Sequence, residues 1–205
     1  FSDDLIDAYA EIPKLASHVH LPVQSGSDAI LAAMKRNHTA ADYLARIKKL
    51  KAARPDILIS SDFIIGFPNE TDDDFMATMN LIAEVDYDHS FSFIFSKRPG
   101  TPAAELSDSV SEETKKERLV ILKDHIKKNT LRKTRDMIGT TQRILVEKVS
   151  DRQEGYMVGS ADNLRVVYFP ADASLIGRFV DVVITDEANV NAVRATAPIW
   201  VEDLG

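Results

Sequence analysis

Residues 57–74 read ILISSDFIIGFPNETDDD. The apolar run ends at Gly66, a short polar loop follows, and Thr71 precedes three carboxylates. A threonine followed by acidic residues is typical of a helix N-terminus, because the hydroxyl caps the first turn and the carboxylates interact favourably with the helix dipole. This order predicts a strand over 57–65, a polar loop, and a helix that begins after Thr71.

Two further stretches repeat this order of apolar run and polar loop. Residues 18–27 read HVHLPVQSGS, and residues 89–101 read HSFSFIFSKRPGT. Helical patterns separate the runs, so we expect strands over 18–24, 57–65 and 89–95 joined by right-handed crossovers in one parallel sheet. The predicted fold class is α/β, with these strands and helices forming a partial (β/α) barrel. Ligand sites lie at the carboxyl ends of such strands.

Side chains alternate across a strand, so each run has two faces. In the third run Phe91 and Phe93 share one face, and Ser92 lies on the other. We expect the phenylalanines to lie under the helices. Gln24, Asp62 and Ser92 are then expected to project into a shared hollow that holds a polar ligand.

Each strand end also has a purely structural interpretation. Residues 24–27 are most often a capped turn between a strand and a helix, and Glu70 is equally typical of a solvated loop carboxylate. Arg98 is either an exposed loop charge or a guanidinium aimed at a carboxylate or phosphate. His18 and His20 are expected to be hydrogen-bonded residues of the hollow, because no third metal ligand stands at a suitable spacing. The coincidence of three such strand ends favours a ligand site.

The pattern of the chain changes after Gly139. A long basic helix is expected over 111–138, and its Lys and Arg residues are interpreted as a solvated face. The segments beyond it indicate short strands with turns at Gly155, Gly159 and Gly177. These strands are expected at 142–149, 164–169, 179–185 and 190–195. The pattern predicts a small all-β barrel, and therefore two domains at 1–139 and 140–205.

Composition narrows the classes of protein that fit. The 205 residues are 44% hydrophobic and 28% charged, with a net charge of −7 and no cysteine. The absence of cysteine excludes disulfides, thiolate metal sites and a cysteine nucleophile within the chain. No apolar run reaches the roughly 18 residues that a membrane span needs, and the acidic amino end is unlike a signal peptide. We expect a cytoplasmic protein without membrane contact, and the missing initiator Met suggests a piece of a longer chain.

Several strings, taken together, resemble the radical-SAM methylthiotransferase family, and most closely its bacterial tRNA-modifying branch. They are HLPVQSGS at 20–27, MKR at 34–36, SDFIIGFP at 61–68 followed by Glu70-Thr71, RPGTPA at 98–103, and the stretch from GTTQ at 139–142 onward. The resemblance covers essentially the whole chain. It implies that residues 1–139 are the C-terminal part of a radical-SAM, TIM-like barrel and that residues 140–205 are a TRAM domain.

The resemblance also implies the chemistry of the full-length protein. Such enzymes use S-adenosyl-L-methionine (SAM) and two 4Fe-4S clusters to add a methylthio group to N6-dimethylallyladenosine next to the anticodon of tRNA. The implied partners are the tRNA anticodon stem-loop, an electron donor such as flavodoxin or ferredoxin, and the N-terminal portion of the same protein. The cluster cysteines are expected upstream of Phe1. This chain alone therefore holds no catalytic or metal-ligating residue and is expected to be inactive.

Carried over by position, the resemblance implies which residues contact SAM. The end of the first strand matches the family's ribose-contacting strand, the second strand end matches the loop that flanks the adenine, and the third loop supplies an arginine near the cavity. Asp62 is added because its side chain is expected to face the hollow. The expected cofactor-binding residues are Gln24, Ser25, Asp62, Ile64, Gly66, Phe67, Glu70 and Arg98. Asn69 stands where the family usually has glycine, which is expected to reshape the second loop.

Two alternative functions stay open. One is a sister methylthiotransferase that modifies threonylcarbamoyl-adenosine or a ribosomal-protein aspartate. The other is a non-catalytic RNA-binding module built on the basic helix and the β-barrel. In either case a barrel without its first strands leaves an open sheet edge beside residues 18–24. We expect an N-terminal portion, a second copy or a packed helix to cover that edge.

Overall fold

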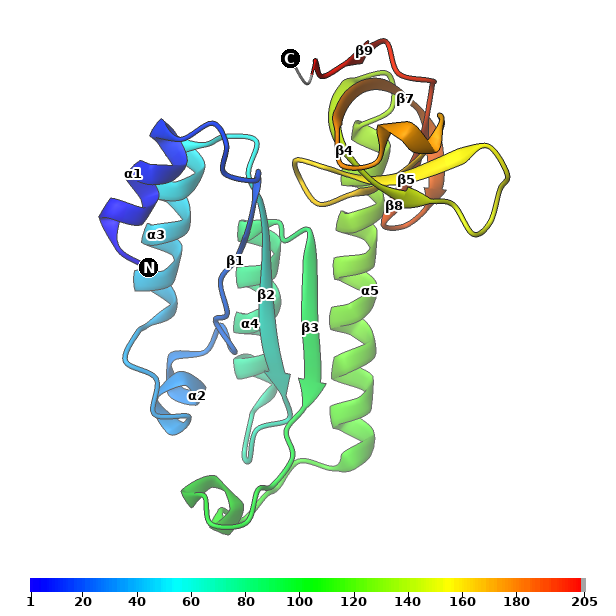
Figure 1. The fold of residues 1–205 in the computed structure, drawn as a ribbon. Coiled ribbons are helices and arrows are strands. Elements are labelled where there is room, and N and C mark those ends of the chain that lie inside the picture. Colours follow the sequence, from blue (N-terminus) through cyan, green and yellow to red (C-terminus); the bar gives the residue numbers. More distant parts are fainter. Residues whose placement is uncertain (204–205) are drawn as a thin grey trace. The chain divides into compact units, whose positions relative to one another are not determined.

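The computed structural model describes residues 1–203, which form two compact units. The first unit comprises residues 1–15 and 19–129, and the second comprises residues 16–18 and the chain from residue 130 onward. Figure 1 shows the helices and strands of both units. Among residues 1–203, no helix combines the length and the apolar character that crossing a bilayer requires.

The first unit alternates helices with three strands, as the sequence predicts. One of its helices, the 25-residue α5, continues into the second unit. The helices are α1 (Asp3–Glu11), α2 (Asp28–Ala33), α3 (Ala40–Ala53), α4 (Asp72–Val85), α5 (Glu112–Asp136) and the short 3-10 helix η1 (Pro102–Glu105). The strands are β1 (His18–His20), β2 (Leu58–Ile65) and β3 (His89–Ile94), in the order β1-β2-β3.

The sheet is parallel, which confirms the α/β class. Strand β2 pairs with β3 from Ser60–His89 to Ile65–Ile94. Strand β1 is shorter than expected because Pro22 has no N–H to donate and Gln24 has a φ of +77°, which interrupts the extended backbone. Beyond His20 the pairing continues through the Leu21 amide, which donates to the Ser60 carbonyl, and through an isolated bridge between Gln24 and Phe63.

Local capping sets the starts of α2, α3 and α4. Thr71 and Asp74 form a capping box at the start of α4, and Thr39 and Asp42 form another at the start of α3. The hydroxyl of Ser27 accepts a hydrogen bond from the Ile30 amide at the start of α2. Each cap satisfies amide groups that would otherwise lack a partner in the first helical turn.

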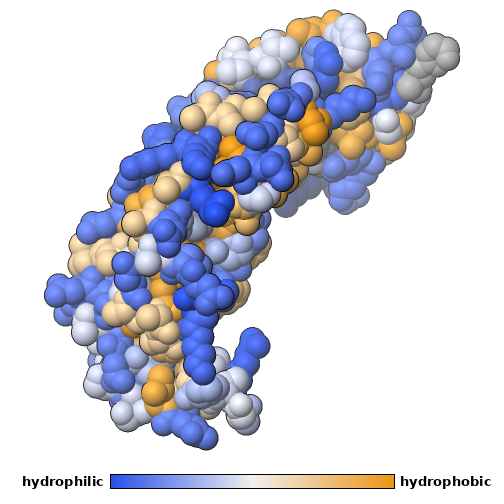
Figure 2. All heavy atoms as spheres, turned by 90° about the vertical axis from the view of Figure 1, so that its left-hand side faces the viewer, coloured by the Kyte–Doolittle hydropathy of each residue, from blue (hydrophilic) through white to orange (hydrophobic). Residues whose placement is uncertain are grey.

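One face of the sheet packs against helices α4 and α5, whose buried Ile82 and Leu122 join the core of the first unit. Phe63 on this face meets the ring of Tyr87 edge-on, with 5.3 Å between the ring centroids. The side of the first unit that carries α1 and α3, at the left of Figure 1, shows mostly hydrophilic residues with small separate hydrophobic areas (Figure 2).

The assignment of the two faces of β3 from the sequence is wrong. Ser92 is buried beside Phe63 on the helix-covered face, whereas Phe91 and Phe93 are exposed on the other face. The reason is the register: neighbouring parallel residues share a face, and the position beside Ser92 already holds the bulky Phe63. Gln24, Asp62 and Ser92 therefore do not project into one hollow.

The second unit is a closed five-stranded barrel with one added strand, as the all-β pattern predicts. Its sheet has the order β4-β5-β6-β8-β7-β9, and pairing of β4 with β7 closes the barrel. The strands are β4 (Thr141–Val149), β5 (Tyr156–Ala161), β6 (Val166–Pro170), β7 (Phe179–Asn189), β8 (Ala192–Ala195) and β9 (Trp200–Val201), with the 3-10 helix η2 (Ala173–Leu175). Buried Arg165 ties the barrel to the end of α5 by donating to the Thr134 hydroxyl and the Thr130 carbonyl.

The sequence pattern does not predict strand β5, because it indicates a turn at Gly159. In the structure Gly159 lies inside the strand and pairs with Val146 of β4. A Cβ atom at this position would lie 2.4 Å from the Leu145 carbonyl oxygen and 2.5 Å from a methyl carbon of Ile144. Glycine is therefore needed here for the close approach of two strands.

This close approach gives a stability prediction. Gly159→Ala is expected to lower the free energy of unfolding of the barrel by about 2 kcal/mol, because the new methyl group overpacks the contact between strands. Ser160→Ala, at the next position of the same strand, is the matched control and is expected to change it by less than about 0.5 kcal/mol. Urea denaturation of the two variants measures the difference, and equal midpoints would contradict the packing argument.

Candidate cofactor pocket

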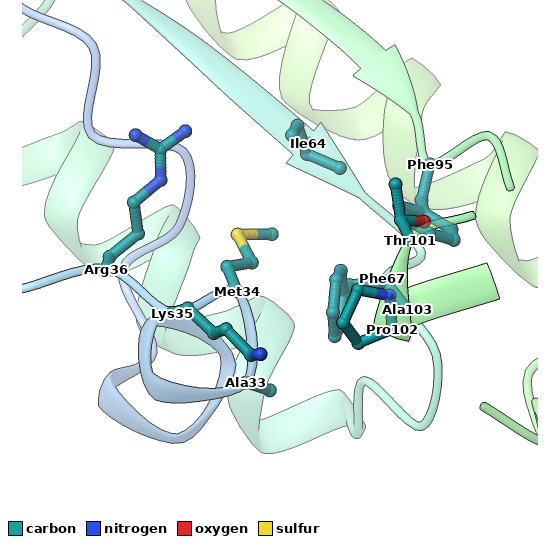
Figure 3. Close-up of a pocket in the computed structure, with 10 residues that line it drawn as sticks. All are labelled: Ala33, Met34, Lys35, Arg36, Ile64, Phe67, Phe95, Thr101, Pro102 and Ala103. Carbon is teal, nitrogen blue, oxygen red and sulfur yellow. The ribbon is translucent and has the colours of Figure 1, made fainter. Parts of the chain in front are cut away.

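A cavity of about 420 Å³ lies at the carboxyl ends of β2 and β3 in the first unit. Its size is within the range of about 300–1,000 Å³ that small-molecule sites occupy. The lining comes from the end of α2, the ends of the two strands and the segment that begins η1 (Figure 3). The lining residues are Ala33, Met34, Lys35, Arg36, Ile64, Phe67, Phe95, Thr101, Pro102 and Ala103.

The floor of this pocket is apolar and aromatic. Phe67 is buried and meets Phe95 edge-on, with 5.0 Å between the ring centroids. Ile64 stands beside them near the end of β2. In Figure 3 the Lys35 side chain points toward the side formed by Phe67 and Pro102. An apolar floor with a cation at its rim suits a flat heteroaromatic ligand that carries an anionic group.

A buried carboxylate holds the loop between β2 and α4 in place. Glu70 is 2% exposed, and its Oε1 accepts hydrogen bonds from the Gly66 amide at 3.2 Å and from Arg118 at 3.0 Å. Arg118 also donates to the Glu70 carbonyl and to the Asp72 carboxylate. The hydrogen bond between Glu70 and Gly66 thus joins the two ends of the loop that carries Phe67, and Arg118 fixes this loop to α5.

A second residue of α5 supports the same loop. Gly66 has a φ of +71°, and a Cβ atom there would lie 2.5 Å from the Cγ of Lys115. Lys115 is buried and pairs with Asp108 at 2.6 Å and with Glu112 at 2.9 Å. Lys115 and Arg118 therefore do not belong to the solvated face expected for this basic helix.

Asn69 adopts the left-handed conformation that glycine favours, with a φ of +66°. Asparagine tolerates this region better than other side-chain-bearing residues do. Its side chain also donates to the Ser107 carbonyl at 3.0 Å and accepts from the Ser109 amide at 3.2 Å. Asn69 therefore holds the loop in a conformation that glycine favours and adds contacts to the segment before α5.

The structure brings four of the eight expected site residues together. Ile64 and Phe67 line the pocket, and Gly66 and Glu70 hold the loop beneath it. Glu70 is buried and paired, so its interpretation as a solvated loop carboxylate does not hold.

The other four residues lie outside the pocket lining. The Ser25 hydroxyl is buried, lies 3.3 Å from that of Thr78 and accepts from the Ser27 amide, as in a capped turn. Gln24 exchanges backbone hydrogen bonds with β2, accepting from the Ile64 amide and donating to the Asp62 carbonyl. Arg98 is exposed in the loop after β3.

Asp62 pairs with a histidine on the open face of the sheet. Its Oδ1 accepts from Nε2 of His20 at 3.2 Å, and Nδ1 of His20 shares a hydrogen bond of 2.8 Å with the Ser60 hydroxyl. Both nitrogens of this ring are therefore engaged, as the hydrogen-bonded interpretation of His20 expects. Among residues 1–203 no group of three or more His, Cys, Asp or Glu residues is arranged to hold a metal ion.

Several lining residues were not identified as site residues from the sequence. Met34, Lys35 and the Thr101-Pro102-Ala103 segment belong to strings that carry the family resemblance, so a signal was present. The expectation that the phenylalanines of the third run lie under the helices does not hold for Phe95, which follows β3 and lines the pocket. Its position in the pocket follows from the register of β3, which alternation alone does not determine.

The burial of Glu70 gives a pH prediction. Burial raises the pKa of this carboxyl above its usual 4.5, against the opposing effects of the Gly66 amide and Arg118. The ionised form is thus disfavoured in the fold, so the stability that Glu70 contributes is complete below about pH 4.5 and is lost as the pH rises through the raised pKa.

Glu70→Gln removes this titration. The free energy of unfolding of the wild type minus that of the variant is therefore expected to fall between about pH 4.5 and neutrality. Urea denaturation across this range measures the difference. A difference that grows with pH would show instead that Arg118 favours the ionised carboxylate over the neutral one.

Comparisons with known proteins place both units in characterised families. The family model of the radical SAM superfamily matches residues 1–82, and that of the TRAM domain matches residues 135–197. A tRNA-2-methylthio-N(6)-dimethylallyladenosine synthase of Psychrobacter cryohalolentis is 59% identical over 198 residues, covering 95% of this chain and 40% of the relative. Proteins of the same name from Hahella chejuensis and Alteromonas mediterranea are 59% and 60% identical over 186 residues, covering 90% and 91% of this chain and 42% and 39% of the relatives.

The chain thus spans about two fifths of the length of the curated relatives it matches. These relatives are named as synthases, and the chain itself contains no cysteine that could ligate an iron–sulfur cluster. Both matched families agree with the parallel sheet of the first unit and the closed barrel of the second. The chain belongs to the radical-SAM methylthiotransferase family, of which it represents a segment with part of the radical SAM fold and a TRAM domain.

Proposed function

We propose that the full-length protein is a SAM-dependent tRNA methylthiotransferase that acts on N6-dimethylallyladenosine next to the anticodon. The observation that carries this proposal is the identity of 59% across 95% of the chain with a relative of that named activity. The matched region includes Ile64, Phe67 and the other residues that line the pocket. The two sister activities and the non-catalytic RNA-binding module are the alternatives.

The pocket at the ends of β2 and β3 is proposed to bind SAM. Ile64 and Phe67 offer the apolar surface that an adenine ring stacks on, and Gly66 allows the backbone to approach closely. Glu70 acts on the cofactor indirectly, by holding the Gly66 amide and the loop. Ser25 acts through the capped turn that it stabilises, since its hydroxyl is engaged within that turn.

The three remaining expected residues lie close to lining residues, either along the chain or through a backbone hydrogen bond. Gln24 is proposed to contact the ribose, because its positive φ sets the backbone at the end of the first strand in an uncommon conformation. Asp62 is proposed to contact the ligand from the open face of the sheet. Arg98 lies three residues before the lining residue Thr101 and is proposed to approach an anionic group of cofactor or substrate.

Other parts of the protein are proposed to supply the redox chemistry. In such enzymes SAM and two 4Fe-4S clusters provide radical chemistry and the methylthio group. A flavodoxin or ferredoxin supplies electrons to the clusters. The cluster ligands are proposed to lie in an N-terminal portion, since this chain holds no cysteine. We also propose that this portion continues the sheet at its β1 edge and that the protein works in the cytoplasm.

The TRAM domain is proposed to bind the tRNA. The family model begins at residue 135 and β4 begins at Thr141, which supports a domain boundary near 139/140. Part of the charge at the basic end of α5 is neutralised, for example by the ion pair of Arg135 with Glu187. Binding is therefore proposed to use local contacts rather than a broad basic surface.

Nucleoside analysis tests the activity. A bacterial strain that lacks the full-length gene is expected to accumulate N6-dimethylallyladenosine without its methylthio group in tRNA, and the restored gene is expected to return the modification. Mass spectrometry of hydrolysed tRNA measures both nucleosides. Loss of the methylthio group from threonylcarbamoyl-adenosine instead, or from a ribosomal-protein aspartate, would identify a sister activity.

A binding measurement tests the pocket. Phe67→Ala in the full-length protein is expected to weaken SAM binding about tenfold, because removal of a buried aromatic contact loses roughly 1.5 kcal/mol. Met76→Ala is the matched control, since Met76 is exposed on α4 and absent from the pocket lining. Calorimetric titration with SAM gives both affinities, and equal affinities would remove Phe67 from the cofactor site.

A further inference from the structure

Two phenylalanines are exposed on the open face of the sheet, in the middle of a regular strand. Phe91 is 52% exposed and Phe93 is 57% exposed, although β3 is the strand that flanks the central β2. They are neighbours on one face because they are two residues apart. Exposed aromatic side chains that gather on one surface mark a binding site more often than single exposed residues do.

Polar groups hold the ring of Phe91 in a defined orientation. His20 and His89 both meet it edge-on, with ring centroids at 5.8 Å and 5.0 Å. His20 is itself fixed by Ser60 and Asp62. A surface held in this way loses little conformational entropy when a ligand binds.

The exposed rings continue into the cofactor pocket. Ile64 is the cross-strand neighbour of Phe93 and also lines the pocket. Phe95 follows Phe93 along the chain and meets Phe67 in the pocket floor. A ligand lying on Phe91 and Phe93 would therefore lie next to a cofactor bound at Ile64 and Phe67.

The charge of this face indicates the kind of ligand. Strands β1 to β3 contain no lysine or arginine, and the polar groups on the face include the rings of His20 and His89, the Ser60 hydroxyl and the Asp62 carboxylate. Such a surface does not attract phosphates, which bind through cations and amide groups. It favours a flat, uncharged ring that stacks on aromatic side chains and presents polar atoms at its edge.

We propose that Phe91 and Phe93 form the platform on which the substrate nucleobase stacks, beside the cofactor pocket; this rests on the proposed function. The two rings are positioning residues that hold the base and its apolar substituent next to the cofactor. His20 and Asp62 border the platform and face the polar edge of the base. The N-terminal portion of the protein is the competing occupant of this face, and the experiment below distinguishes the two.

The test uses the full-length protein with Phe93→Leu and Phe93→Tyr, and the same pair at Phe91. Leucine keeps the apolar volume without the ring, whereas tyrosine keeps the ring. The leucine variants are expected to bind an anticodon stem-loop carrying N6-dimethylallyladenosine at least fivefold more weakly than the wild type, and the tyrosine variants within twofold of it. SAM affinity is expected to stay within twofold in all four, with Met76→Leu on α4 as the control.

A second measurement separates substrate positioning from packing. In the leucine variants the ratio of 5′-deoxyadenosine released to methylthiolated product is expected to rise, because SAM is cleaved without a correctly held base. Leucine variants that keep wild-type stem-loop affinity would overturn the proposal. Leucine and tyrosine variants that both lose thermal stability and SAM affinity would overturn it too, because that result assigns the face to packing with the N-terminal portion. If the wild type forms no methylthiolated nucleoside, the proposed function is refuted. The stem-loop affinities of the variants then still test whether Phe91 and Phe93 bind the nucleobase.

Discussion

The parallel register of β2 and β3 is the constraint on which the rest of the first unit depends. Pairing of Asp62 with Phe91 and of Ile64 with Phe93 puts the ends of both strands at the same edge of the sheet. Phe67 and Phe95, which follow these ends, meet there and form the floor of the pocket. A shift by one residue would turn every side chain of β3 to the other face, burying its phenylalanines and separating this pair.

The long helix α5 stabilises the loop that the register brings into position. Arg118 neutralises and hydrogen-bonds a carboxylate that would be unfavourable when buried alone, and the methylene groups of Lys115 pack against Gly66. The same helix continues into the second unit, where Arg165 donates to its Thr130 carbonyl. Basic residues that look like an RNA-facing strip in the sequence thus include several whose function is structural.

Features that depend on neighbouring residues in the chain could be predicted from the sequence. The capping boxes at Thr39 and Thr71 need only residues three positions apart, and the parallel sheet follows from alternating strands and helices. The strings that carry the family resemblance include most of the pocket lining.

Features that depend on contacts between distant residues could not be predicted. Alternation separates the two faces of β3 but does not say which face lies under the helices, so Phe91 and Phe93 were assigned to the wrong one. Gly159 resembles a turn residue until its approach to Leu145 is known. The burial of Glu70 requires Arg118, 48 positions further along the chain.

Amide hydrogen exchange of the full-length protein, with and without SAM, tests most directly whether the strand ends of the first unit bind the cofactor. The account predicts slower exchange on addition of SAM in residues 64–70 and 95–103, with unchanged exchange in the barrel strands β5 and β6. Protection that appears elsewhere, with none in these two loops, would contradict it.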